Sequence, residues 1–143
     1  MALLNDRDRE AVRTELAKLA GPVKLVVFSQ SLSPASELCR QNEMLVKEVA
    51  ELSDQITVEI LNLAIDRDRA AAYGVTDVPA IVVEGARDYG LRFLGIPSGY
   101  EFSNLIDSMV VASSGVPSLT AETRTALEGL AGDIDIKVFS TPT

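Results

Sequence analysis

The only thiol in the chain lies at the start of a predicted helix. The stretch "FSQSLSPASELCRQ", residues 28–41, contains Cys39, and Ser36 stands three residues before it. A dithiol redox enzyme carries Cys-x-x-Cys at such a place, because exchange needs an attacking thiolate and a resolving thiol. One cysteine closes no intramolecular disulfide. The stretch is therefore either a redox motif without its attacking sulfur or a serine near an ordinary buried thiol.

The position of each side chain in the helix separates these two interpretations in part. Free N–H groups and the helix macrodipole favour a thiolate in the first turn. Ser36 occupies that turn, and a serine hydroxyl stays protonated without a general base. Cys39 lies a turn deeper beside apolar positions, where cysteine acts as a small hydrophobic side chain. We expect a largely buried Cys39, and a monothiol site that forms mixed disulfides through Cys39 stays open as an alternative.

The composition excludes several other kinds of chemistry. The 143 residues include no histidine, which excludes Ser-His-Asp and Cys-His catalysis as normally built and leaves a poor ligand set for zinc. A net charge of −8 argues against nucleic acid as a partner. The opening "MALLNDRDRE" has no secretory signal pattern, and no apolar run approaches the roughly 20 residues that span a bilayer. We expect no metal, cofactor or membrane partner, and a single cysteine is typical of the reducing cytoplasm.

Periodicity predicts an α/β fold with an additional N-terminal helix. Apolar, β-branched runs predict strands over residues 23–29 and 56–61, and a strand, turn and strand over 78–95. Helical spacing predicts helices over residues 6–20, 34–52 and 100–112, with a short helix that ends near Gly74. Asn42 fills one position of the apolar face of the second of these helices. A βαβ unit followed by a ββα unit gives a mixed four-stranded sheet.

The C-terminal part of the sequence repeats the beginning. Residues 12–31, "VRTELAKLAGPVKLVVFSQS", align without gaps to residues 123–142, "TRTALEGLAGDIDIKVFSTP", with nine of twenty positions identical. The match spans helix, glycine break and strand in one register, which indicates an internal repeat of period 111. We therefore expect one complete unit in residues 1–115. Residues 116–143 are expected to be a linker followed by the first helix and strand, 134–139, of a truncated second unit.

Three segments carry a resemblance to a known family: "VTDVPAIVV" at 75–83, "GARDYGLRFLGIPSGYEF" at 85–102 and "IKVFSTPT" at 136–143. With them the chain resembles the tandem thioredoxin-fold protein disulfide oxidoreductases, or glutaredoxin-like proteins. The resemblance implies a thioredoxin-like fold, with Ser36 at the attacking and Cys39 at the resolving cysteine position. It also implies that the Val78–Pro79 peptide bond is cis and that Pro79 faces the cysteine helix. The backbone of Val78 would then pair with an extended substrate.

The function that the resemblance implies is that of an N-terminal, redox-degenerate unit. Such a unit would support or present disulfide-containing proteins or thiol substrates to an active second unit, and would be inactive alone, so whether this chain is itself an enzyme stays open. A similar tandem occurs in the flavoprotein component of alkyl hydroperoxide reductase, which gives an alternative parent protein. A pure dimerisation or interaction module is another alternative. Because an apolar strand with unpaired backbone groups is a template for pairing, we also expect a homodimer through residues 134–139.

Overall fold

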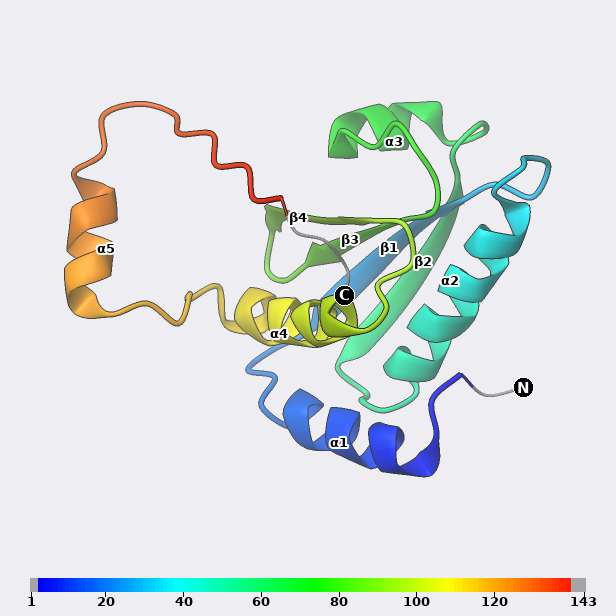
Figure 1. Cartoon of the computed structure of the whole chain (residues 1–143), viewed down its shortest axis with the longest axis horizontal. Helices are drawn as coiled ribbons and strands as arrows, with labels where there is room; N and C mark the ends of the chain where they lie inside the picture. The colour runs from blue at the N-terminus through cyan, green and yellow to red at the C-terminus, as the bar shows by residue number, and fades with distance from the viewer. Residues whose placement is uncertain (1–2, 140–143) are drawn as a thin grey trace.

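The computed structural model describes residues 3–139 and confirms the predicted α/β architecture around a four-stranded sheet (Figure 1). Its elements, in chain order, are α1 (Asp6–Leu16), β1 (Val23–Ser29), α2 (Ser36–Ala50), β2 (Ile56–Asn62), α3 (Arg67–Tyr73), β3 (Ala80–Glu84), β4 (Asp88–Leu94), α4 (Tyr100–Ser114) and α5 (Ala121–Glu128). No helix within residues 3–139 is long and apolar enough to cross a membrane.

The sheet has the strand order β2-β1-β3-β4. β1 runs parallel to β2 and antiparallel to β3, and β3 runs antiparallel to β4. Parallel strands need a crossover, and α2 supplies it between β1 and β2. The sequence of β1, VKLVVFS, is almost continuously apolar because this central strand is covered on both faces. Because β1 is a central strand, α2 begins at the middle of the sheet edge rather than at its side.

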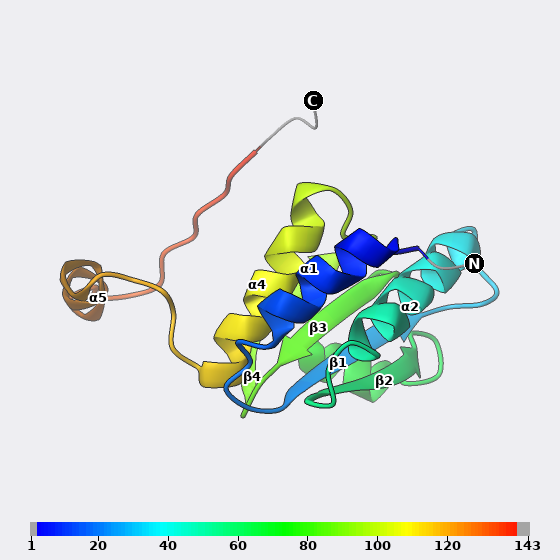
Figure 2. The same cartoon turned by 90° about the horizontal axis from the view of Figure 1, so that it is seen from below.

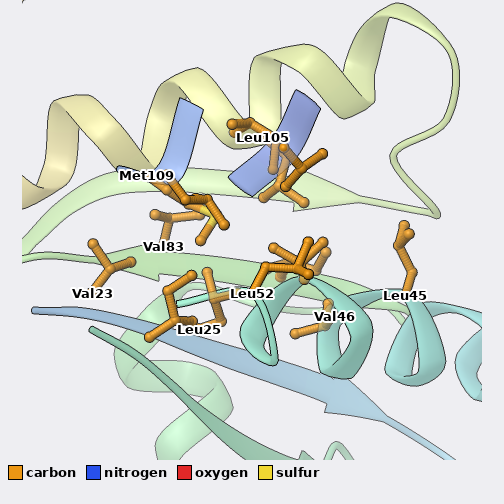
Figure 3. Close-up of a cluster of buried hydrophobic side chains, with 14 of the residues drawn as sticks. Val23, Leu25, Leu45, Val46, Leu52, Val83, Leu105 and Met109 are labelled. Carbon is orange, nitrogen blue, oxygen red and sulfur yellow. The ribbon is translucent and has the colours of Figure 1, made fainter. Parts of the chain in front are cut away.

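Helices cover the two faces of the sheet unequally. α1, α2 and α4 lie on one face, and the short α3 lies on the other (Figures 1 and 2). Leu25 of β1, Val46 of α2 and Met109 of α4 point into the core between the sheet and the three helices (Figure 3). On the α3 face a smaller cluster forms around Phe28, whose ring meets the Tyr73 ring edge-on at 6.0 Å between centroids. The larger core therefore anchors α2, the helix that carries Cys39.

α1 begins where the sequence predicts but ends at Leu16 rather than near residue 20. The Asn5 side chain accepts a hydrogen bond from the Asp8 N–H at 2.9 Å and caps the helix start. After Leu16 the chain tightens into a turn in which the Leu19 N–H donates to the Leu16 carbonyl. The Ala20 N–H then donates to the Ser113 hydroxyl of α4 at 3.0 Å. The chain therefore turns away before residue 20 and contacts α4, and no local pattern in the sequence indicates this contact.

The C-terminal segment forms its predicted helix but not its predicted strand. α5 covers Ala121–Glu128, and none of its residues is buried. Residues 133–139 have no regular secondary structure, because no strand of the sheet lies beside them to complete a ladder. The largest apolar side chains of α5 and the turn after it, Leu127 and Leu130, are both about half exposed. The rest of the predicted unit, residues 140–143, lies outside the described residues.

Candidate functional site

The predicted site residues gather at one end of the sheet. The register pairs Ser29 with Asn62 of β2 and Phe28 with Ala80 of β3, so Pro79 lies beside the end of β1. From this end the chain passes through the loop at residues 30–35 into α2 (Figure 1). The structure thus brings the start of α2 and the Val78–Pro79 turn to the same end of the sheet, as the resemblance implies.

Ser36 is the first residue of α2. The helix begins two residues later than predicted, because Ser33 forms a turn ahead of it. The Ser33 hydroxyl accepts from the Ala35 N–H at 3.2 Å, and its carbonyl accepts from the Ser36 N–H at 3.0 Å. Ser36 is half-buried and has no side-chain hydrogen bond within the described residues. It occupies the first turn, where the helix dipole would stabilise a thiolate. A neutral hydroxyl receives little electrostatic stabilisation there.

Cys39 is buried, with 1% of its surface exposed. Its N–H donates to the Ala35 carbonyl at 2.9 Å. Cys39 therefore lies in the first turn of α2 rather than a turn deeper, because the helix starts at Ser36 and not at residue 34. The prediction of a buried thiol is therefore confirmed. A thiol reacts as a solvent-accessible thiolate, and buried structural cysteines are inert. In this conformation Cys39 is packed with the apolar face of α2 and is closed to a substrate disulfide.

A hollow of about 310 Å³ lies next to the helix start. It is lined by Ser29, Gln30, Ser31, Ser36, Glu37, Arg40 and Glu43, so Cys39 does not open into it. Two hydrogen bonds from Arg40, at 2.6 and 3.0 Å, and one from Gln41 lower the pKa of the Glu37 carboxyl. Glu43 accepts a hydrogen bond from the Ser29 hydroxyl at 2.5 Å.

The chemistry of this hollow is limited by what surrounds Ser36. Its two carboxylates are engaged by Arg40 and Ser29, and no residue in the sequence is a histidine. Nucleophilic catalysis by a hydroxyl needs an adjacent general base. Within residues 3–139 no cluster of side chains could hold a metal ion. Within the described residues, Ser36 therefore has no free general base beside it in this hollow.

Asn42 is a feature of the site whose environment the sequence does not reveal. It lies one turn after Cys39, is fully buried, and neither amide atom has a hydrogen-bond partner among the described residues. The signal in the sequence is an amide in an otherwise apolar helical stripe. That pattern places Asn42 on the buried face, but it does not show that the surrounding elements offer no partner.

The Val78–Pro79 turn precedes β3 rather than opening it, since β3 begins at Ala80. The Val78–Pro79 peptide bond is cis. Pro79 is buried, and its carbonyl accepts a hydrogen bond from the Gly95 N–H at 2.8 Å. Val78 is half-buried, and within residues 3–139 its backbone takes part in no backbone hydrogen bond.

Large apolar side chains are exposed at the same end of the sheet. Leu32 in the loop after β1 and Ile65 after β2 are almost fully exposed, and Leu38 in the first turn of α2 is 50% exposed. β1 and β2 are parallel neighbours, so the segments that follow them leave the sheet together. All three side chains are therefore exposed on segments that leave the same end of the sheet. We call Leu32, Leu38 and Ile65 the apolar rim.

The sheet order, the crossover helix after β1 and the Val78–Pro79 turn define a thioredoxin-like α/β domain. Over 86 residues the chain is 35% identical to a probable thioredoxin of Methanothermobacter thermautotrophicus, a match that covers 59% of this chain and 93% of that protein. The chain belongs to the thioredoxin family. No protein-family model matches it.

Two solved structures extend the similarity beyond the thioredoxin unit. The alkylhydroperoxide reductase protein AhpF of Enterococcus faecalis superposes with a TM-score of 0.78 at 25% identity, over 90% of this chain. A protein disulfide oxidoreductase of Aeropyrum pernix gives a TM-score of 0.75 at 26% identity, over 92% of this chain. This chain spans 61% and 57% of the length of those two chains. The resemblance to tandem thioredoxin-fold proteins is confirmed by both.

Proposed function

We propose that this chain is a redox-degenerate thioredoxin domain that presents disulfide-containing proteins or thiol substrates to a redox-active second thioredoxin unit. In this role the domain binds and orients the substrate, and the second unit carries out thiol-disulfide exchange. The second unit would begin with the repeated segment, residues 120–139. We place the protein in the cytoplasm, where a single unpaired cysteine stays reduced.

The observation that carries the proposal is the combination of Ser36 at the attacking position with a 1% exposed Cys39. Exchange begins with attack by an accessible thiolate, and this domain offers none. Burial of Cys39 also favours this proposal over a monothiol site, which would need the sulfur at the surface.

A binding role is supported by what surrounds the inactive motif. The apolar rim supplies hydrophobic contacts, and the free N–H and C=O of Val78 can pair with an extended segment in the manner of an added strand. None of these features needs a thiol. The AhpF protein and the protein disulfide oxidoreductase have longer chains than this one, which supports a second unit. Their similar TM-scores support an alkyl hydroperoxide reductase flavoprotein and a protein disulfide oxidoreductase about equally as the kind of parent protein.

The redox part of the proposal is tested by insulin reduction with dithiothreitol. We expect the chain not to accelerate turbidity, and Cys39 to alkylate with iodoacetamide only after unfolding. Ser36→Cys places a second sulfur three residues from Cys39 and should then form a disulfide and accelerate the reaction. Turnover by the unaltered chain that Cys39→Ala abolishes would establish the monothiol alternative instead.

The binding part is tested by titrating the chain with oxidised insulin and following backbone amide shifts by NMR. We expect changes at Val78 and along the apolar rim. Leu38→Asp should weaken binding by about tenfold, because a charge replaces an apolar contact. Leu127→Asp is a matched control, since Leu127 is 49% exposed against 50% for Leu38 but lies on α5. Equal binding by both variants, or shifts confined to other surfaces, would overturn the proposed role.

A further inference from the structure

The three residues before Pro79 have a backbone without internal partners. Thr76 and Asp77 are exposed and Val78 is half-buried. Within residues 3–139 the N–H and C=O groups of these three residues take part in no hydrogen bond. On either side the backbone is engaged, since the Val75 N–H and the Pro79 carbonyl both form backbone hydrogen bonds. A short run of unpaired backbone at the surface is a template to which an extended segment can add as a strand.

Pro79 limits how a strand can be added here. It has no N–H, so pairing extends from Val78 only toward Asp77 and Thr76. When Val78 exchanges both backbone hydrogen bonds with one residue of an antiparallel segment, Asp77 lies in the next pair, which shares no backbone hydrogen bond. In such a pair the Cα atoms are about 4.5 Å apart and the side chains approach each other closely. The segment residue that follows the partner of Val78 therefore meets Asp77.

Asp77 carries a carboxylate that no other part of residues 3–139 neutralises. Its side chain is exposed and forms neither a hydrogen bond nor an ion pair there. Two cations lie on segments that leave the same end of the sheet, Arg40 and Arg67. Arg40 is held by two hydrogen bonds to Glu37, and Arg67 has an aspartate on either side in the sequence. A segment that binds beside Val78 therefore meets the negative charge of Asp77.

We propose that Asp77 selects extended protein segments that carry a lysine or arginine directly after the residue that pairs with Val78. This inference rests on the proposed function, because it requires substrate segments to pair with Val78. Opposite charges that face each other across antiparallel strands stabilise the pairing, and like charges destabilise it. The net charge of −8 also favours encounter with basic partners. The substrate class is therefore a basic extended segment and not an acidic one.

Two capped heptapeptides of alternating valine and serine test the selection. They differ only in the central residue, which is lysine in one and glutamate in the other, and neither contains a thiol. We expect both to shift the backbone amides of residues 76–78 in NMR titrations. The lysine peptide should bind about fivefold more tightly. This preference should shrink as the salt concentration is raised from about 0.05 to about 0.5 M, because salt screens exposed charges.

Variants of Asp77 test whether this carboxylate is the selecting charge. Asp77→Asn should make the two peptides bind equally, and Asp77→Lys should reverse the preference. Asp54→Asn is the matched control, because Asp54 is also exposed and without an ion pair among the described residues. It lies in the turn before β2, at the opposite end of the sheet, so the preference for the lysine peptide should survive this substitution.

The outcomes separate this inference from the proposed function. If both peptides shift the Val78 amide but bind the unaltered chain equally, the selection by Asp77 is wrong and the proposed function stands. A preference that Asp77→Asn leaves unchanged also overturns the inference, because the selecting charge then lies elsewhere. If neither peptide perturbs residues 76–78, the substrate-binding role fails together with the selection.

Discussion

Asn42 interrupts the apolar face of α2, and burial of its amide lowers the stability of the fold. Both polar atoms of its amide are enclosed without a hydrogen-bond partner among the described residues. An unsatisfied buried polar group costs about 1–3 kcal/mol, and an apolar side chain of similar size removes this cost. We therefore expect Asn42→Leu to raise the free energy of unfolding by about 1–2 kcal/mol in urea denaturation.

Asn104 provides the control for this prediction. It is an exposed asparagine on α4, where its amide is hydrated in the folded protein. Asn104→Leu should change the free energy of unfolding little. A loss of stability in Asn42→Leu would contradict the prediction and would mean that Asn42 holds a buried water or ligand.

For single residues, the sequence predicts where the site residues lie in the helix but not which hydrogen bonds they form. The spacing of Ser36 and Cys39 and the predicted helix placed both side chains correctly at the start of α2. The missing partner of Asn42 depends on which atoms surround its amide, and that arrangement is created only when distant segments pack. Likewise, the hydrogen bond between Ser29 and Glu43 joins two elements that the sequence does not show to be in contact.

Among the glycines of the chain, Gly85 in the β3–β4 turn is the one at which an added Cβ atom would meet the nearest neighbour. A Cβ atom on Gly85 would lie 1.8 Å from the carbonyl oxygen of Ala112, near the end of α4. Because both partners are backbone, no side-chain rotation relieves the clash. We expect Gly85→Ala to lower the free energy of unfolding by about 1–3 kcal/mol or more, measured by urea denaturation.

Gly129→Ala is the matched control for this turn. The nearest atom to a Cβ on Gly129 is at 3.5 Å, and its backbone conformation suits any residue. We expect its stability to stay within about 0.5 kcal/mol of the unaltered chain. Equal effects of the two substitutions would mean that the turn can move away from α4 at little cost.

The sequence predicted elements reliably where local pattern decides them. β1 and β2 were predicted almost to the residue, because a β-branched apolar run of that length fits a buried strand. The segment at 134–139 has the same pattern and is not a strand, because a strand exists only beside a partner. The residue types therefore predict that a segment can form a strand. Whether it does depends on a neighbouring strand with which its backbone can form hydrogen bonds.

Over the whole molecule, one charge network joins three elements on the α3 side of the sheet. Glu59 of β2 accepts two hydrogen bonds from Arg69 of α3, both at 3.0 Å, and pairs with Lys24 of β1. Hydrogen bonds from Arg69 and then from Lys24 lower the pKa of the Glu59 carboxyl to about 2, from an ordinary value of 4.5. The same contact with Glu59 raises the pKa of Lys24.

The sign of the resulting pH dependence follows from the lowered pKa. A carboxyl that ionises more easily in the folded state stabilises the fold above its unfolded pKa. That stabilisation is lost as the pH falls from about 4.5 to about 2, where Glu59 becomes protonated in the folded state too. The Glu59 side chain is 32% exposed, so solvent screening limits the contribution to about 1 kcal/mol at neutral pH. We expect Glu59→Gln to destabilise the chain by that amount at pH near 7.

The difference between Glu59→Gln and the unaltered chain should therefore shrink as the pH is lowered, and this trend distinguishes the ion network from packing. Urea denaturation at several pH values between about 7 and 3 measures it. Glu128→Gln is the control, because Glu128 is exposed at the end of α5 and forms no ion pair among the described residues. Its effect should be small at every pH. If the Glu59→Gln difference stays constant with pH, the loss comes from side-chain packing, and the network between β1, β2 and α3 contributes nothing electrostatic to the fold.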